Sequence, residues 1–366
     1  MDDETGLDEA VPLELTVLGE CGGMRFDQAL AKMLPEYSRS RLQEWIAQGL
    51  VTLDGAAATI KQKVSGGEAV MVQPQLHPSE QPYRAEDIPL DIVYEDDSIL
   101  VINKPVGLVV HPGSGNWQGT LLNALLHHAP QLAQVPRAGI VHRLDKDTSG
   151  LLVVAKTLTA QTALVRQLQA RSVHREYLAL AWGEVTHGGT VDAPIGRHPA
   201  QRTKMAVIDN GKPAVTHYSI EEHFPDISTS SRSCTLLRCK LETGRTHQIR
   251  VHLASIGHPL VGDSTYLKGS QKCPRPPRHG GAKHAGAGGA SKRLLPQSAG
   301  SASSVSQPQL RPILSAFPRQ ALHAERLGLE HPVTGEWMEW QAPLPDDMAQ
   351  LLANIRNESG KISTTD

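Results

Sequence analysis

Short apolar segments alternate with polar turns along most of the chain, a pattern typical of proteins with many strands and few long helices. Near the N-terminus, apolar residues at helical spacing predict helices at about 26–33 and 38–48, and Ser38 is the expected N-cap of the second helix. Residues 51–55 then predict a strand with an Asp-Gly hairpin turn, and residues 68–72 predict a further strand. This part of the chain is therefore expected to form a small module of helices and strands.

The longer remainder mixes the periodicities of strands and helices. Its expected strands are 91–94, 98–102, 151–155, 175–183 and 235–241, and its expected helices are 120–129, 159–169 and 346–355. Thr159 is the expected N-cap of the middle helix. Thr246 is the expected N-cap of another short helix, which would place His247 and Arg250 on one face. The fold class that we expect for the chain is α+β.

The length of 366 residues exceeds a usual single domain, which indicates one large and one small domain. The expected organisation is a disordered acidic tail at 1–13, a small domain at 14–75, a linker at 76–88, a large domain at 89–356 and a tail at 357–366. Residues 269–318 are rich in Pro, Gly, Ser and basic residues without periodicity, so we expect a low-complexity insertion within the large domain.

The formal net charge of −2 does not by itself favour a nucleic-acid partner, but the charges are unevenly distributed. Residues 1–23 hold seven acidic residues and no Lys or Arg, whereas residues 268–319 hold nine Lys or Arg and no acidic residue. Local patches of charge, and not totals, determine attraction to RNA.

Cysteine usage and hydropathy indicate a cytoplasmic protein. The four cysteines are scattered without a Cys-x-x-Cys pair, so neither a disulfide framework nor a structural zinc site is expected. No secretory signal opens the chain, and no apolar stretch approaches the ~18 residues of a membrane span.

The most informative stretch is residues 139–150, where a polar loop lies directly before the predicted strand at 151–155. Asp145 has Arg143 two residues before it and Lys146 directly after it. Cations this close keep a carboxylate ionised, and an ionised carboxylate can serve as a nucleophile or a base. The loop alone is equally consistent with a surface turn containing weak ion pairs.

The string His-Arg-Leu-Asp-Lys-Asp-Thr-Ser-Gly at 142–150 resembles the signature of the RluA-type family of RNA pseudouridine synthases. That resemblance implies that Asp145 is the catalytic nucleophile. Two further strings resemble the same family, Arg-Glu-Tyr at 175–177 and Gly-Arg-Thr-His-Gln-Ile-Arg at 244–250. They imply that the ring of Tyr177 lies against the target base and that Arg250 pairs with the catalytic carboxylate. An Asn-Lys-Pro element at 103–105 also fits the family, where a structural role is expected.

Residues 14–75 resemble the S4 RNA-binding domain in their order of two helices, short strand and Asp-Gly turn. A plain helical cap domain is the alternative for this module. In the large domain, residues 188–218 interleave basic residues with Pro and Gly, a composition that suits loops lying on phosphates. The residues expected to contact RNA are Arg39, Arg41, Lys61 and Lys63 in the small domain, and Arg143, Arg197, Arg202, Lys204 and Arg245 in the large one.

The resemblance implies an isomerase that flips specific uridines out of large-subunit (23S) ribosomal RNA, in the helix 69 region, and converts them to pseudouridine. The large domain would then be a synthase domain with a mixed, mostly antiparallel sheet flanked by helices. The expected partner is ribosomal RNA, free or within assembling subunits. Because the isomerisation has no redox or phosphoryl step, no cofactor and no metal are expected. We also expect a monomer with no membrane association.

Two other functions fit parts of the sequence. An RNA-binding or assembly factor with an inactive synthase fold would be favoured if Asp145, Tyr177 or Arg250 were altered, and all three are present. A magnesium-dependent hydrolase could use Asp145 and Asp147 as an Asp-x-Asp metal site, although the adjoining cations would repel a divalent ion. His247, His252 and His258 suggest a metal site only weakly, since no carboxylate or Cys completes a ligand spacing.

Overall fold

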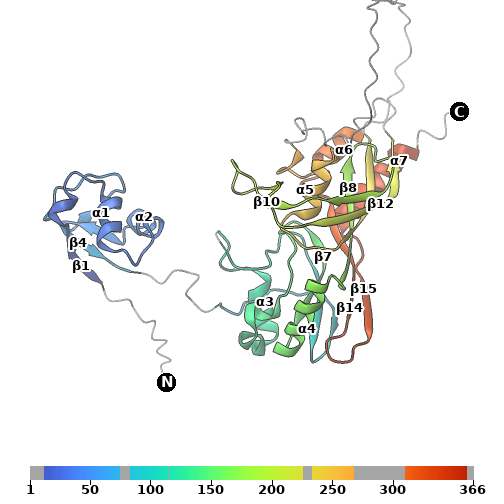
Figure 1. The fold of residues 1–366 in the computed structure, drawn as a ribbon, viewed down its shortest axis with the longest axis horizontal. Helices are drawn as coiled ribbons and strands as arrows, with labels where there is room; N and C mark the ends of the chain where they lie inside the picture. The colour runs from blue at the N-terminus through green and yellow to red at the C-terminus, as the bar shows by residue number, and fades with distance from the viewer. Residues whose placement is uncertain (1–11, 75–82, 114, 226–232, 268–309, 361–366) are drawn as a thin grey trace, which may run out of the picture. The chain divides into compact units, whose positions relative to one another are not determined.

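The computed structural model describes residues 12–74, 83–113, 115–225, 233–267 and 310–360. The chain forms two compact units, residues 1–82 and residues 83–366 (Figure 1). Most of the predicted acidic tail, linker and insertion lies outside the described residues. The predicted tail ends one residue too late, because Leu13 already belongs to the first strand.

The N-terminal unit packs two short helices against a four-stranded antiparallel sheet. Its elements are β1 (Leu13–Thr16), α1 (Phe26–Met33), α2 (Arg39–Ala47), β2 (Val51–Leu53), β3 (Ala56–Ala57) and β4 (Ala69–Val72), and the strand order is β1-β4-β2-β3. Ser38 caps α2 as predicted, because its Oγ accepts the backbone N–H of Arg41 at 3.3 Å. Positive φ angles at Asp54 and Gly55 form the predicted turn. Phe26, Leu30 and Leu42 are fully buried at the centre of this unit.

The larger unit is built on a nine-stranded sheet. Its strands are β5 (Ile92–Glu95), β6 (Ile99–Lys104), β7 (Ser149–Ala155), β8 (His174–Trp182), β9 (Gly189–Asp192), β12 (Val215–Phe224), β13 (Cys234–Leu241), β14 (Leu322–Glu330) and β15 (Trp337–Gln341). The order is β5-β6-β7-β14-β8-β13-β12-β9, and β15 pairs with β14. β7 and β14 run parallel and the other described pairs are antiparallel, which confirms the predicted mixed, mostly antiparallel sheet.

Helices cover both faces of this sheet, which explains why its central strands are continuous apolar runs. Alternate residues of β6 and β7 pack on α3 (Leu121–His128), and the intervening residues pack on α4 (Leu158–Ala170). Farther along the sheet, α6 (Leu310–Ala316) and α7 (Asp346–Gly360) pack against β8 and β13. α5 (Gln248–Ser255) follows β13 and carries residues of the candidate site.

Three element predictions need correction at their ends. α4 is capped by Thr157, whose Oγ1 accepts the backbone N–H of Ala160, and not by Thr159. α5 is preceded by His247 in a left-handed conformation, and not by Thr246 as a side-chain cap. α7 continues to Gly360, beyond the predicted end at 355, so the predicted tail begins too early.

Three region predictions were also wrong in part. α6 lies inside the predicted insertion, and Leu314 and Phe317 are buried, so the end of that segment belongs to the core. Residues 83–88, predicted as linker, hydrogen-bond to Asn123 of α3. Residues 188–218, predicted as loops, contain β9, the start of β12 and a hairpin of β10 (Ile195–Arg197) and β11 (Met205–Val207). Apolar residues at Val191 and Ile195 are buried, and this packing outweighs the local Pro and Gly content.

Two further findings bear on composition. Cys21, Cys234 and Cys239 are buried free thiols in the part of the chain that the structure describes. Among the described helices, none is long and apolar enough to cross a membrane.

Candidate active site

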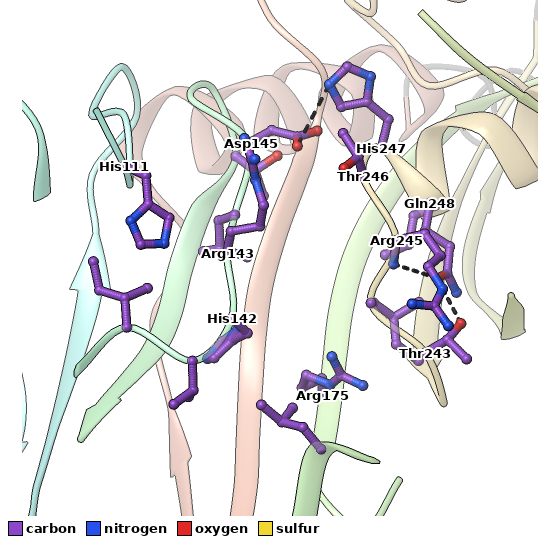
Figure 2. Close-up of a pocket in the computed structure, with 18 of the residues that line it drawn as sticks. His111, His142, Arg143, Asp145, Arg175, Thr243, Arg245, Thr246, His247 and Gln248 are labelled. Atoms are coloured by element: carbon purple, nitrogen blue, oxygen red, sulfur yellow. Dashed lines mark hydrogen bonds and ion pairs between the residues drawn. The ribbon is translucent and has the colours of Figure 1, made fainter. Parts of the chain in front are cut away.

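The larger unit contains a cleft of about 850 Å³ that opens between the loop preceding β7, the start of β8 and the segment between β13 and α5. All three strings that resembled the synthase family contribute to its walls, although they are separated by up to about 100 positions in the sequence. Figure 2 shows Asp145 and His247 facing each other at one end of this cleft, with Arg175 and His142 toward the other end.

Asp145 and Arg250 form an ion pair at this site, as the family resemblance implied. Nη1 of Arg250 donates to Oδ2 of Asp145 at 2.8 Å. The Asp145 side chain is 15% exposed and that of Arg250 is 7% exposed, so the carboxylate reaches the cleft while its cation lies beneath it. The pair is therefore shielded from bulk water on the side of Arg250.

Asp263 holds Arg250 in place and was not recognised in the sequence. Its fully buried carboxylate accepts from Nε and Nη2 of Arg250 at 2.7 and 3.0 Å, a bidentate pair. Burial alone would lower the pKa of Arg250, but the hydrogen bonds and charge of Asp263, with those of Asp145, raise it. The guanidinium is thus a permanent cation with one N–H group directed at Asp145. Asp263 follows Gly262 in a short loop, and a single acid there gives no sequence signal.

A buried lysine holds the backbone of the loop that carries Asp145. The Nζ of Lys104 is fully buried and donates to the carbonyl oxygens of Pro105, Leu108 and Lys146 at 2.7–3.0 Å. Burial lowers the pKa of Lys104 to about 7, against the opposing influence of Asp147 and Asp145.

Two consecutive residues, Arg319 and Gln320, also hold this loop. Nη1 of Arg319 donates to the carbonyl of Asp147 at 3.0 Å, and Nε2 of Gln320 donates to the hydroxyl of Thr148. The conformation around Asp145 is therefore determined by segments distant in sequence.

Tyr177 lines the cleft from β8 and is only 6% exposed. Burial raises the pKa of its hydroxyl, and the negative charge of Asp145 contributes in the same direction. The ring is therefore a neutral aromatic surface in the wall of the cleft, and its contact with the target base stays a prediction.

His247 approaches Asp145 from the opposite side to Arg250. Its Nε2 lies 3.8 Å from Oδ1 of Asp145, and its Nδ1 lies 2.8 Å from the hydroxyl of Tyr266. The Tyr266 oxygen already accepts the backbone N–H of Met205 at 3.0 Å. We infer that the Tyr266 hydroxyl donates to Nδ1, so neutral His247 carries its proton on Nε2, toward Asp145. The sequence suggested His247 only as a weak metal ligand, and Tyr266 gave no signal.

His142 has a structural role within the loop. Its Nε2 accepts the backbone N–H of Val153 at 3.1 Å, which requires an unprotonated nitrogen. Burial and the nearby charge of Arg175 lower the pKa of His142 to about 3, so it stays neutral. Arg175 itself is 5% exposed and lines the cleft, and the sequence gave it no role of its own.

The basic residues predicted to contact RNA in the N-terminal unit differ in their surroundings. Nη2 of Arg39 lies 2.6 Å from the buried carboxylate of Asp27, and Arg41 stacks over the rings of Tyr37 and Trp45. Burial would raise the pKa of Asp27, but hydrogen bonds from Arg39, Gln43 and Arg25 outweigh it and lower the pKa to about 2. Lys61 and Lys63 are exposed. RNA contact by these four residues stays a prediction.

In the larger unit, Arg143 and Arg245 line the cleft and are exposed. Nε of Arg245 donates to the carbonyl of Pro213 at 3.0 Å, so this side chain also holds the turn, and its contact with RNA stays a prediction. Arg197, Arg202 and Lys204 belong to the β10–β11 hairpin, where Nη1 of Arg197 donates to the carbonyl of Arg202. Met205 connects this hairpin to the site through Tyr266.

Among the described residues, no group of three or more His, Cys, Asp or Glu side chains is placed to hold a metal ion. His252, one of the three suggested metal ligands, instead hydrogen-bonds to Thr216 and to the carbonyl of Ala193.

Comparison with known proteins decides the family. Residues 98–255 match the RNA pseudouridylate synthase family, and residues 24–70 match the S4 domain. The chain is 55% identical to Ribosomal large subunit pseudouridine synthase D of Nitrosomonas europaea, over 94% of this chain and 88% of that protein. It is 52% identical to the protein of the same name from Escherichia coli K12, over 95% of both chains. This chain belongs to the RNA pseudouridylate synthase family.

As a member of this family, the chain is an RNA pseudouridine synthase with an S4 domain at its N-terminus. The family match ends at residue 255, so it includes Asp145, Tyr177 and Arg250 and stops before Asp263 and Tyr266. Asp263 and Tyr266 belong to the segment that follows α5. They contact Arg250 and His247, respectively, at the start of that helix.

Proposed function

We propose that this synthase converts uridines of large-subunit ribosomal RNA to pseudouridine, at loop-presented sites in the helix 69 region, with Asp145 as the attacking carboxylate. The names of its relatives refer to the large ribosomal subunit, and the sequence similarity to these relatives extends over nearly the whole chain. The observation that carries the catalytic part is the ion pair of Asp145 and Arg250 at the wall of an 850 Å³ cleft.

The reaction breaks the N1–C1′ bond of a uridine, rotates the uracil and joins C5 to C1′, and the proton lost from C5 is balanced by one gained at N1. Attack at C1′ and attack at C6 both begin with an ionised carboxylate. Arg250 occupies Oδ2 of Asp145, which leaves Oδ1 as the oxygen that meets the substrate. The guanidinium of Arg250 also fixes the orientation of the Asp145 carboxylate in the wall of the cleft.

Tyr177 supplies the surface on which the uracil lies while it is detached. Base stacking on an aromatic ring stabilises a complex by about 1–3 kcal/mol and needs no cofactor. Because a stacked base in an RNA helix is out of reach, the target nucleotide has to be flipped into the cleft. Arg143, exposed at the mouth of the cleft, is suited to occupy the space left by the flipped base or to bind a phosphate.

Lys61 and Lys63 of the S4 domain and the basic β10–β11 hairpin would follow the RNA backbone outside the cleft. Met205 of the hairpin hydrogen-bonds to Tyr266, which in turn hydrogen-bonds to His247. RNA bound to the hairpin would therefore lie two hydrogen bonds from His247. Ribosomal RNA, free or in an assembling subunit, is the proposed partner. The monomeric state and the cytoplasmic location stay predictions.

The target is tested by mapping pseudouridines in large-subunit ribosomal RNA after carbodiimide treatment and primer extension. The RNA would come from cells that lack this gene and carry either the wild type, Asp145→Asn or the control Asp147→Asn. We expect one or a few clustered pseudouridines in helix 69 with the wild type and the control, and none of these with Asp145→Asn. Pseudouridines that appear only in transfer RNA would contradict the proposed substrate.

A further inference from the structure

Arg175 is a buried cation at the end of the cleft away from Asp145 (Figure 2). It precedes Tyr177 by two positions on β8, so the two side chains project from the same face of the strand. The residue is 5% exposed. Its one hydrogen bond in the described part of the chain is long, from Nη2 to the carbonyl of Glu242 at 3.3 Å, and its buried Nε has no partner there.

The other buried arginines of this unit are neutralised by carboxylates. Arg250 binds Asp145 and Asp263, and Arg319 binds both oxygens of Asp347 at 2.6 and 2.8 Å. Arg175 has no acidic side chain within 4 Å among the described residues. A buried charge without a counter-charge costs several kcal/mol. A folded chain tolerates this cost where a ligand supplies the missing charge.

The surroundings of Arg175 add further positive charge. Arg171 lies near Arg175, because both contact Glu242, and Arg245 also lines the cleft. The acid there, Glu242, is already occupied, because its Oε2 binds Arg171 and its Oε1 binds His217, both at 2.7 Å. Since Glu242 is committed to these two partners, it does not neutralise Arg175. The far end of the cleft therefore carries an excess of positive charge.

Gly244 shows that the guanidinium reaches the wall of the cleft. A Cβ added to Gly244 would lie 2.8 Å from Nη1 of Arg175, closer than carbon and nitrogen atoms approach. Gly244 is itself a lining residue. The absence of a side chain at this position thus leaves space for the guanidinium at the surface of the cleft.

We propose that this end of the cleft is a binding site for a phosphate group of the substrate RNA, with Arg175 as its central ligand. The site rests on the proposed function, since RNA is the source of the phosphate. A guanidinium presents paired N–H groups that match the oxygens of a phosphate. A phosphate bound here would anchor the RNA strand beside the nucleotide that stacks on Tyr177, which places Arg175 in substrate positioning and not in the chemical step.

The test compares Arg175→Met with Arg356→Met, which removes an exposed arginine of α7 that pairs with Glu222 far from the cleft. Both changes are made in an Asp145→Asn background, so that the bound RNA is not modified during the measurement. The RNA is a ribosomal fragment that the wild type modifies. Its dissociation constant is measured as a function of salt concentration. Loss of one phosphate contact lowers the slope of log K against log salt by about 0.7–0.9. We expect this loss, with weaker binding, for Arg175→Met and no change for Arg356→Met. An unchanged slope with Arg175→Met would overturn the proposal.

Thermal unfolding of the RNA-free full-length protein supplies a second test that does not depend on the substrate. Inorganic phosphate is compared with chloride at equal ionic strength. We expect phosphate to raise the midpoint of the wild type and of Arg356→Met, but not that of Arg175→Lys, in which the forked donor is lost and the charge is kept. We also expect Arg175→Met to unfold at the wild-type midpoint or above, because it removes an unpaired buried charge. An equal phosphate effect in wild type and Arg175→Lys would show that Arg175 is only structural.

Discussion

At the scale of residues, the two carboxylate oxygens of Asp145 have different partners. Arg250 binds Oδ2 of Asp145 at 2.8 Å, while Nε2 of His247 lies 3.8 Å from Oδ1. Tyr266 determines which nitrogen of His247 carries the proton, because its hydroxyl accepts from Met205 and donates to Nδ1. Burial raises the pKa of Tyr266 and lowers that of His247, so a neutral phenol faces a neutral imidazole at pH 7.

Tyr266→Phe should lower the rate of a single turnover by about tenfold, equivalent to 1.4 kcal/mol, the usual size of one hydrogen bond. Without the phenol, neutral His247 can place its proton on Nδ1 and direct a lone pair at Asp145. Acid reverses this effect, because a protonated imidazole carries hydrogen on both nitrogens. Since burial lowers the pKa of His247 in the wild type, we expect the difference between wild type and variant to shrink as the pH falls below the ordinary histidine value of 6.5.

Tyr94→Phe is the matched control for this measurement, since it also removes a phenol hydrogen bond, to Asp96 at 2.9 Å, but lies outside the cleft. The rate at each pH would be obtained from single-turnover conversion of an RNA fragment. A deficit that is constant from pH 5 to pH 8 would show that Tyr266 only supports the fold.

At the scale of elements, the loop that carries Asp145 is positioned by the parallel pairing of β7 and β14. Gly150 lies at this contact with φ +111°, and an added Cβ would lie 2.2 Å from the carbonyl oxygen of Ala324. The glycine at the end of the signature string therefore allows β14 to approach β7. This contact brings Arg319 and Gln320, which precede β14, onto the loop that carries Asp145.

Gly150→Ala should destabilise the larger unit by about 3–5 kcal/mol, through backbone strain and overpacking against β14. The control is Gly335→Ala, in the turn between β14 and β15, where φ is +73° but no atom lies within 4 Å of the added Cβ. Strain alone should lower the free energy of unfolding of that variant by about 1–2 kcal/mol. Equal losses in urea unfolding would show that close packing of β7 and β14 is not what requires the glycine.

Elements with strong local signals could be predicted from the sequence, and those set by distant contacts could not. The apolar runs of β6, β7 and β13 gave strands at the right positions, and Ser38 gave the start of α2. α6 was missed because a short helix after a low-complexity stretch gains its stability from burial of Leu314 against the sheet. The start of α5 was misplaced because Thr246 does not cap the helix. The side chain of Gln248 instead accepts the backbone N–H of Arg245.

The same division holds within the site. Asp145, Tyr177 and Arg250 were identified because they belong to strings that resemble the family, and the structure brings all three to one cleft. Asp263 and Tyr266 were not identified, because each acts through a contact that local sequence does not encode. Arg175 belongs to the Arg-Glu-Tyr string, but that string implied a role for Tyr177 alone.

At the scale of the whole molecule, the two units have separate cores. The hydrophobic cluster around Phe26 contains only residues of the N-terminal unit, and the clusters of the larger unit contain none of them. The cleft is lined by residues 83 and beyond. The cleft therefore belongs to the larger unit alone, and we expect catalysis to take place there and the S4 domain to contribute to binding.

Removal of residues 1–82 should leave kcat near its wild-type value and raise KM by about tenfold, a loss of 1.4 kcal/mol of binding. In the full chain, replacement of both Lys61 and Lys63 by alanine should change KM in the same direction by a smaller factor. Steady-state conversion of a ribosomal RNA fragment by the three proteins gives both constants. A truncated enzyme with a normal KM and a greatly reduced kcat would place the S4 domain in the chemical step.

The central claim, that Asp145 performs the isomerisation in this cleft, is tested most directly by release of tritium from RNA labelled at C5 of uridine. That hydrogen is lost only when C5 becomes bonded to C1′. We expect the wild type and Asp147→Asn to release one tritium per pseudouridine formed, and Asp145→Asn to release none while still binding the RNA. Tritium release by Asp145→Asn at the wild-type rate would contradict the assignment of the nucleophile.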